Sequence, residues 1–230
     1  MSSPGETLFL AVHILDRVIT RRMHYPERSN RLHRDHRVIG LVCLMIAGKY
    51  EEMTNHNYRL LMFLHIAKGL KLQGEIDVGI LQRNERDVLK ILDYRLGWPG
   101  PLSFLRRCSR ADEGDQFART GAKFVLELMM LDIRFLHYMP SLQAAAAIFV
   151  ARFALGRTAW NSSMAQYSGY EAKDIDPVVH DIVMLLREEE ASDTFPYYKY
   201  CTRVNYRISK FMLNWAQRLK NLDLLQQLYR

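Results

Sequence analysis

Histidine is a frequent metal ligand in proteins, and four of the eight histidines in this sequence are the candidates to consider. His33 and His36 lie about one helical turn apart, and His56 and His65 follow further along. A protein zinc site usually needs four ligands, and neither cysteines nor carboxylates gather near these histidines to complete one. We therefore expect no metal site.

Motifs that would indicate catalysis are absent from the sequence. It contains no Gly-x-Gly-x-x-Gly, no Gly-Lys-Ser/Thr phosphate loop and no Gly-x-Ser-x-Gly turn. Nucleotide binding and hydrolase chemistry therefore lack support. We expect no catalytic residue and no cofactor.

Aromatic and basic residues alternate near the C-terminus, a combination that suits single-stranded nucleic acid. The aromatic residues are Phe195, Tyr197, Tyr198, Tyr200 and Tyr206, and the basic ones are Lys199, Arg203 and Arg207. Basic side chains often lay their alkyl stems over apolar surface while the charge stays in water. The favoured interpretation is that the aromatic residues cover a helical bundle, so nucleic acid is not the expected partner.

Charge alone indicates an acidic partner without identifying it. The chain of 230 residues has a formal net charge of +7 and a pI near 9.4. Its three cysteines, Cys43, Cys108 and Cys201, are widely spaced and odd in number, which favours a reducing compartment over a disulfide framework.

Membrane insertion and secretion are not indicated. The apolar stretch 142–155 is interrupted by Arg152 and is shorter than the roughly 20 residues that a bilayer span needs. The first residues lack the basic and apolar regions of a secretory signal. We expect an intracellular protein that makes no membrane contact.

Glu85 and Leu89 are four residues apart and so share one face of a predicted helix, where a charge and an apolar anchor can meet one partner. Lys49 falls near the end of another predicted helix, where a cation gains about 0.3 to 1 kcal/mol from the helix dipole. From the residues alone, a capped helix end and a solvated carboxylate are the simpler interpretation, and a binding face is the alternative.

The elements that must position these residues are predicted to be helices. Ser3, Pro4 and Glu6 resemble a helix start, and Leu8, Val12, Leu15 and Ile19 recur at the helical period. Helices are expected at about 3–22, 35–52, 57–68, 75–96, 101–110, 115–137, 140–155, 159–167, 171–189 and 204–219. Only the aromatic segment 195–200 shows strand-like alternation.

Two of these helices are apolar all round and rich in small residues, which is typical of a helix surrounded by others. They are the stretches 35–52 and 141–152, one in each half of the chain. We therefore predict an all-α protein with two tandem helical bundles. The predicted divisions are residues 1–98, residues 99–220 and a C-terminal tail of residues 221–230.

Several motifs in order over about 210 residues resemble the cyclin family, and in particular fungal B-type mitotic cyclins. The first cyclin box is matched by residues 6–17 (Glu-Thr-Leu-Phe-Leu-Ala-Val-His-Ile-Leu-Asp-Arg) and 47–52 (Ala-Gly-Lys-Tyr-Glu-Glu). The second box is matched by Phe104-Leu-Arg-Arg, Leu131-Asp-Ile-Arg-Phe-Leu, Pro140-Ser-Leu-Gln-Ala-Ala-Ala-Ala, Tyr167-Ser-Gly-Tyr and Tyr198-Lys-Tyr.

The resemblance implies a non-catalytic subunit that binds and activates a cyclin-dependent serine/threonine kinase and so controls G2/M progression. Such a subunit binds beside the PSTAIRE-type helix of the kinase and reaches protein substrates through the complex. Lys49 and Glu85 match the charged contact residues of the family, and the matching apolar contacts are Tyr50, Leu89, Tyr94 and Leu96.

The resemblance also assigns roles to Asp16 and Arg37. Asp16 matches a structural aspartate that pairs with an arginine of the preceding helix and with the lysine at the position of Lys49. Arg37 stands where the family usually has glutamine, in a patch that docks substrates. The sequence begins where the second helix of the family begins. We therefore expect a first box truncated at its N-terminus, an incomplete docking patch, and a fragment or a late-starting gene model.

A second function remains open, because cyclin-like folds also serve as DNA-binding or scaffolding modules in transcription. The basic charge suits that role. Those proteins usually carry a zinc ribbon and lack the pair at Lys49 and Glu85.

Overall fold

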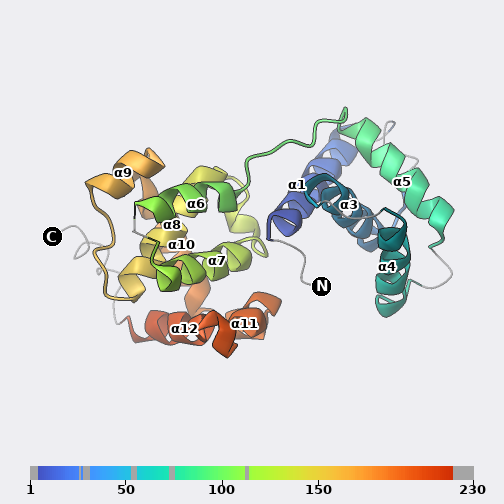
Figure 1. Ribbon diagram of the computed structural model, residues 1–230. Helices are drawn as coiled ribbons and strands as arrows, with labels where there is room; N and C mark the ends of the chain where they lie inside the picture. The colour runs from blue at the N-terminus through green and yellow to red at the C-terminus, as the bar shows by residue number, and fades with distance from the viewer. Residues whose placement is uncertain are drawn as a thin grey trace. The chain divides into compact units, whose positions relative to one another are not determined.

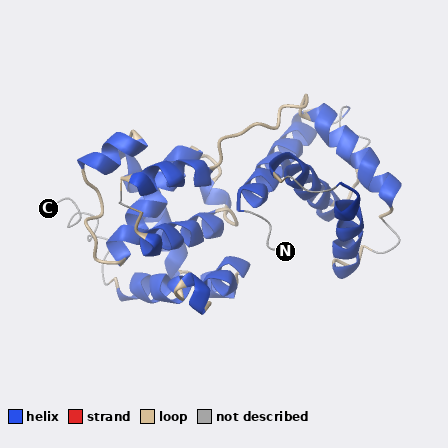
Figure 2. Ribbon diagram, in the orientation of Figure 1, coloured by secondary structure: helices blue, strands red, loops and turns tan. Residues whose placement is uncertain are grey.

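The computed structural model describes residues 5–25, 27, 32–52, 56–72, 76–111 and 114–219. The chain separates into two compact units, Met1–Trp98 and Pro99–Arg230. Every regular element in the described ranges is helical and none is a strand, so the all-α prediction is confirmed (Figure 2).

The first unit is built around α3 (Figure 1). Its helices are α1 (Gly5–His24), α3 (His36–Glu51), α4 (His56–Gly69) and α5 (Val78–Ile91). The small and β-branched residues of α3 let α1 and α5 pack closely, and Val38, Val42 and Ala47 are fully buried. This central position of α3 places its last turn next to α5.

The second unit is built around α8 (Pro140–Ala154), which α6, α7 and α10 surround (Figure 1). Its other helices are α6 (Pro101–Arg110), α7 (Gln116–Met129), α9 (Ser162–Ser168), α10 (Ala172–Arg187), α11 (Phe195–Tyr200) and α12 (Ile208–Arg218). Short 3-10 turns are η1 (Ile133–Phe135), η2 (Glu189–Asp193) and η3 (Arg203–Asn205). Ala144 to Ala147 are fully buried, because only small side chains fit between so many helices.

Two predicted helices end earlier in the structure, and the segment with strand-like alternation is helical. The helix expected at 115–137 stops at Met129, and the Asp132 side chain then caps η1 by accepting from the Arg134 N–H. The segment 195–200 is the helix α11, capped by Thr194 with Pro196 in its first turn, and not a strand. The helix expected to continue to residue 96 ends at Ile91, where a turn begins.

Some expectations fall outside the described residues. These are the helix start at Ser3 and Pro4 and the tail 221–230. Among the helices of the described ranges, none is both long and apolar enough to cross a bilayer.

Candidate functional site

Lys49 and Glu85 come together from α3 and α5. The Lys49 Nζ donates to both Glu85 carboxylate oxygens, at 2.6 and 2.8 Å. Leu81, Val88 and Ile91 turn the apolar face of α5 into the core, which brings Glu85 to the edge facing α3. The exposed side-chain fractions are 27% for Lys49 and 16% for Glu85, so both charges remain within reach of a partner.

The four expected apolar contact residues belong to the same unit as this ion pair. Tyr50 and Tyr94 are 55% and 65% exposed, while Leu89 and Leu96 pack partly buried against the core. Large exposed aromatic side chains beside a half-buried charge are typical of protein-binding surfaces. The structure thus places all six expected contact residues on α3, α5 and the segment that follows α5.

The segment after α5 holds Tyr94 in an unusual conformation. Asp93 and Tyr94 have φ values of 51° and 57°, a region that costs an L-residue about 1 to 2 kcal/mol. The Tyr94 N–H donates to the Leu89 carbonyl at 2.9 Å. On the other side, a Cβ at Gly97 would lie 3.4 Å from the Tyr50 hydroxyl oxygen. These contacts connect the two tyrosines to one short segment.

Three residues of α1 clamp this segment, and none of them was singled out from the sequence. The Arg21 Nη1 donates to the Ile91 carbonyl at 2.6 Å and to Asp93 Oδ2 at 2.9 Å. Further along, Arg17 Nη1 donates to the Arg95 carbonyl at 2.7 Å.

The third contact of the α1 clamp is a ring stack. The His13 ring lies parallel to Trp98, with ring centroids 4.1 Å apart. Burial, together with the nearby Arg17 charge, lowers the pKa of His13 to about 4. His13, Arg17 and Arg21 recur every fourth residue and so share one helix face, but that spacing does not indicate what the face contacts.

Asp16 does not pair with Lys49 as the resemblance implied. Lys49 binds Glu85 instead, and the Asp16 carboxylate makes no ion pair with any residue that the structure describes. Burial between α1 and its neighbours raises the pKa of Asp16. Burial, together with the nearby Asp16 charge, raises the pKa of Cys43 to about 12.

Arg37 lies at the start of α3 and is bound to Asp35. Its Nε lies 3.1 and 3.0 Å from the two Asp35 carboxylate oxygens, and its Nη2 lies 2.6 Å from Oδ2. Asp35 also caps α3 by accepting from the Arg37 N–H at 2.8 Å. The hydrogen bonds from Arg37 lower the pKa of Asp35 to about 2. A role for Arg37 in substrate docking remains a prediction.

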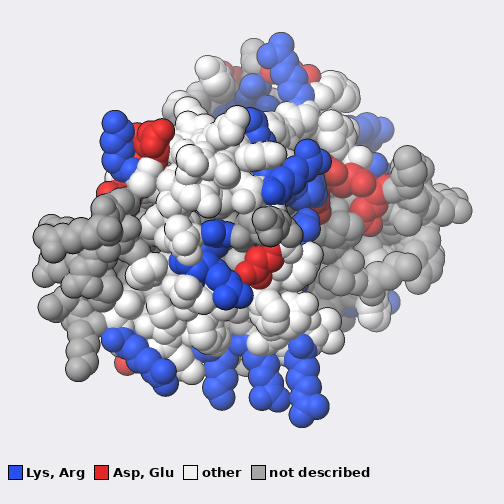
Figure 3. Space-filling view, turned by 60° about the vertical axis from the view of Figure 1, so that its left-hand side comes forward, with Lys and Arg blue, Asp and Glu red and all other residues white. Residues whose placement is uncertain are grey.

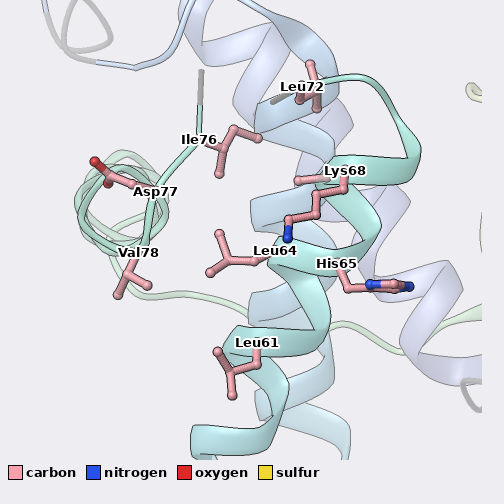
Figure 4. Close-up of a pocket in the computed structure, with 9 residues that line it drawn as sticks. Leu61, Leu64, His65, Lys68, Leu72, Ile76, Asp77 and Val78 are labelled. Carbon is pink, nitrogen blue, oxygen red and sulfur yellow. The ribbon is translucent and has the colours of Figure 1, made fainter. Parts of the chain in front are cut away.

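A groove of about 520 Å³ lies between α4 and the start of α5 (Figure 4). Leu61, Leu64 and Lys68 border it from α4, and Ile76 and Val78 border it from the other side. Its lining is mostly aliphatic and has no convergent polar set that would orient a small ligand. Across the described ranges, no group of three or more His, Cys, Asp or Glu side chains is arranged to hold a metal ion.

Comparison with protein families gives two matches that follow one another along the chain. The N-terminal domain model of cyclins matches residues 3–97, and the C-terminal domain model of cyclins matches residues 99–213.

The chain is also similar to curated fungal proteins. It is 37% identical over 213 residues to the G2/mitotic-specific cyclin cdc13 of Schizosaccharomyces pombe, covering 93% of this chain and 41% of that protein. It is 35% identical over 216 residues to the G2/mitotic-specific cyclin-2 of Saccharomyces cerevisiae, covering 94% and 41%. Identity to the G2/mitotic-specific cyclin-B of Emericella nidulans is 34% over 217 residues, covering 94% and 42%.

The chain thus spans about two fifths of the length of these relatives. Both domain models match in order, and together they take in nearly all of the described helices. This chain therefore belongs to the cyclin family.

Proposed function

We propose that this chain is a regulatory subunit that binds a cyclin-dependent serine/threonine kinase and activates it to control G2/M progression. In this proposal it performs no chemistry of its own, acts in the nucleus and cytoplasm, and reaches protein substrates through the kinase. The observation that carries the proposal is the partly buried Lys49–Glu85 pair in a unit that also exposes the rings of Tyr50 and Tyr94.

The physical requirement on such a subunit is a difference in affinity between two kinase states. To invert a 1:99 equilibrium it must bind the active state more tightly by about 5.5 kcal/mol. Tyr50, Tyr94, Leu89 and Leu96 offer the apolar surface for that difference, and the charged pair offers hydrogen bonds to groups flanking the kinase helix. The α1 clamp supports this role because it orders the Tyr94 segment before binding.

The test is histone phosphorylation by a purified mitotic cyclin-dependent kinase mixed with the purified chain. We expect activation by the wild type and loss of both binding and activation in Glu85→Arg, because the reversed charge repels Lys49 and removes the acceptor. The matched control is Glu190→Arg, which makes the same charge change on an exposed residue of the second unit. Helical circular dichroism should be unchanged in both.

A charge-swapped variant separates an interface role from a purely internal one. Lys49→Glu combined with Glu85→Arg restores an ion pair inside the chain but inverts what a partner meets. If the kinase contacts these charges, the swapped variant stays inactive although its stability recovers. Full activity of the swapped variant, or wild-type binding by Glu85→Arg, would rule out the assigned face.

A further inference from the structure

The stretch from Thr194 to Leu219, which forms α11, η3 and α12, contains five basic residues and no acidic residue. Lys199 is used within the fold, since its Nζ donates to both Glu127 carboxylate oxygens at 2.6 and 2.8 Å. The other four basic residues are exposed and make no ion pair with a described residue; they are Arg203, Arg207, Lys210 and Arg218. A cluster of like charge is therefore left to solvent.

These cations form a row and do not scatter. Lys210 and Arg218 lie on the outer side of α12 and Arg207 directly precedes it, while Ile208, Met212 and Leu213 face the core. At 1.5 Å per residue, the row from residue 207 to 218 is about 16 Å long. Figure 3 shows Lys and Arg side chains projecting at the bottom of the view, where α11 and α12 lie in Figure 1.

Exposed apolar side chains lie among the charges. Val204 is 86% exposed, Tyr206 47% and Phe211 42%. Phe117 of α7 is 46% exposed and packs on Tyr206, with the ring centroids 4.3 Å apart. A partner that buries these apolar groups gains free energy by removing them from water. Their exposure therefore favours a binding surface over a face that only contacts solvent.

We propose that this η3–α12 surface, made of Arg203, Val204, Tyr206, Arg207, Lys210, Phe211 and Arg218, binds an acidic segment of a partner protein that carries apolar side chains between its carboxylates. The unpaired cations attract the carboxylates, and Val204 and Phe211 receive the apolar side chains. An extended segment rises about 3.3 Å per residue, so about five residues cover the row.

Nucleic acid fits this surface less well. Its binding by such surfaces depends on aromatic rings with a free face on which bases stack. The Tyr206 and Phe117 rings pack against each other, Val204 is aliphatic and cannot stack, and Phe211 offers one exposed ring where a run of bases needs several. The proposal does not depend on kinase binding, because the Lys49–Glu85 face belongs to the first unit.

The experiment measures fluorescence anisotropy of three labelled probes with the full chain at about 0.15 M salt, where distant charges are screened. The probes are a peptide of eight glutamates with two central leucines, a peptide of ten glutamates, and a ten-nucleotide oligo-dT. The test variant is Arg203→Glu, Arg207→Glu and Lys210→Glu together. The matched control, Arg34→Glu, Lys173→Glu and Arg187→Glu, changes the net charge equally at exposed sites off the row.

We expect the wild type to bind the leucine peptide about fivefold or more tightly than the all-glutamate peptide. The test variant should lose about tenfold or more of that affinity and the control less than about threefold, since local charges dominate once salt screens distant ones. Val204→Ser with Phe211→Ser, which alters only exposed side chains, should abolish the preference for leucine.

Three results would overturn the proposal. One is an equal loss in the test and control variants, which would indicate general charge attraction. Another is tighter binding of oligo-dT than of the leucine peptide, which would favour nucleic acid. The third is no measurable binding of the leucine peptide by the wild type.

Discussion

Glu127 shows how the second unit accommodates a buried charge. Its side chain is 3% exposed and accepts from Lys199 Nζ and, at 2.8 Å, from the Tyr200 hydroxyl. The Lys199 Nζ also lies 5.2 Å from the centre of the Tyr200 ring. A buried carboxylate is costly unless paired and hydrogen-bonded, so this cluster ties α11 to α7.

Breaking that cluster should strongly destabilise the folded protein. Replacing Glu127 with Ala leaves the Lys199 charge and the Tyr200 hydroxyl without their acceptor, and we expect a loss of about 3 to 5 kcal/mol in the free energy of unfolding. Urea denaturation followed by circular dichroism measures it, with the exposed Glu190→Ala as control. A Glu127→Met, Lys199→Met double variant should recover much of the loss; no recovery would argue against unpaired charge as the cause.

His13 predicts how stability depends on pH. Its folded pKa of about 4 lies below the ordinary value of 6.5, so between these pH values the unfolded chain binds a proton that the folded chain does not. Stability should therefore fall as the pH drops from 6.5 to 4. Because the ring is only half buried, we expect an effect on the order of 1 kcal/mol.

The check is urea denaturation at pH 7 and pH 5 of the wild type and of His13→Phe. Phenylalanine keeps a ring against Trp98 and does not titrate. The difference between the two pH values should shrink in the variant. An unchanged difference would assign the pH dependence to other groups.

At the scale of elements, the α1 clamp decides how the turn after α5 is presented. Arg21→Ala removes both of its contacts to that turn, so Tyr94 becomes less ordered in the free chain. Kinase binding must then order Tyr94, and this lowers the affinity. We expect kinase affinity to fall about tenfold. The melting temperature should change little, since exposed ion pairs contribute roughly 0 to 1 kcal/mol.

Arg34→Ala is the matched control, because it removes the same charge from an exposed residue of the first unit. Titration calorimetry with the kinase measures both variants. Equal affinities would show that the Arg21 contacts do not position Tyr94.

Two helical glycines should respond oppositely to the same change. A Cβ at Gly121 of α7 would lie 3.1 Å from the Ala151 Cβ and 3.5 Å from Ile208, whereas at Gly40 of α3 the nearest atom is 3.9 Å away. We expect Gly121→Ala to cost about 1 to 3 kcal/mol by overpacking α7 against α8 and α12. Gly40→Ala should stabilise by about 0.5 to 1 kcal/mol through lower unfolded-state entropy.

Thermal melts of the two single variants decide this. If both variants are destabilised, the packing around Gly40 of α3 has no space for a methyl group. If both are stabilised, α8 and α12 shift to accommodate the methyl group at residue 121.

At the scale of the whole molecule, each unit has its own buried helix and its own core. The residues around α8 form a hydrophobic core within Pro99–Arg230, and those around α3 form one within Met1–Trp98. Since stability comes from burial within a unit, residues 99–230 should fold when expressed alone. Helical circular dichroism with a cooperative melt would support this, and a non-cooperative transition would contradict it.

Local pattern alone determined the helical class and both central helices. The apolar residues of α3 and α8 are contiguous in sequence, and a helix whose whole surface is apolar must be surrounded, whatever surrounds it. The contact face on α3 and α5 came from the resemblance to cyclins and not from the pattern, since Glu85 and Lys49 taken singly resemble a solvated carboxylate and a capped helix end.

Tertiary structure decided what depends on residues far apart in the chain. It brought Lys49 and Glu85 together across 36 positions, and it set the clamp of Arg21 on Asp93 across 72. It also made α11 a helix, because Tyr200 and Lys199 reach the buried Glu127 of α7 in that conformation. Such contacts gain their free energy only when distant segments are already packed, so no local periodicity reports them.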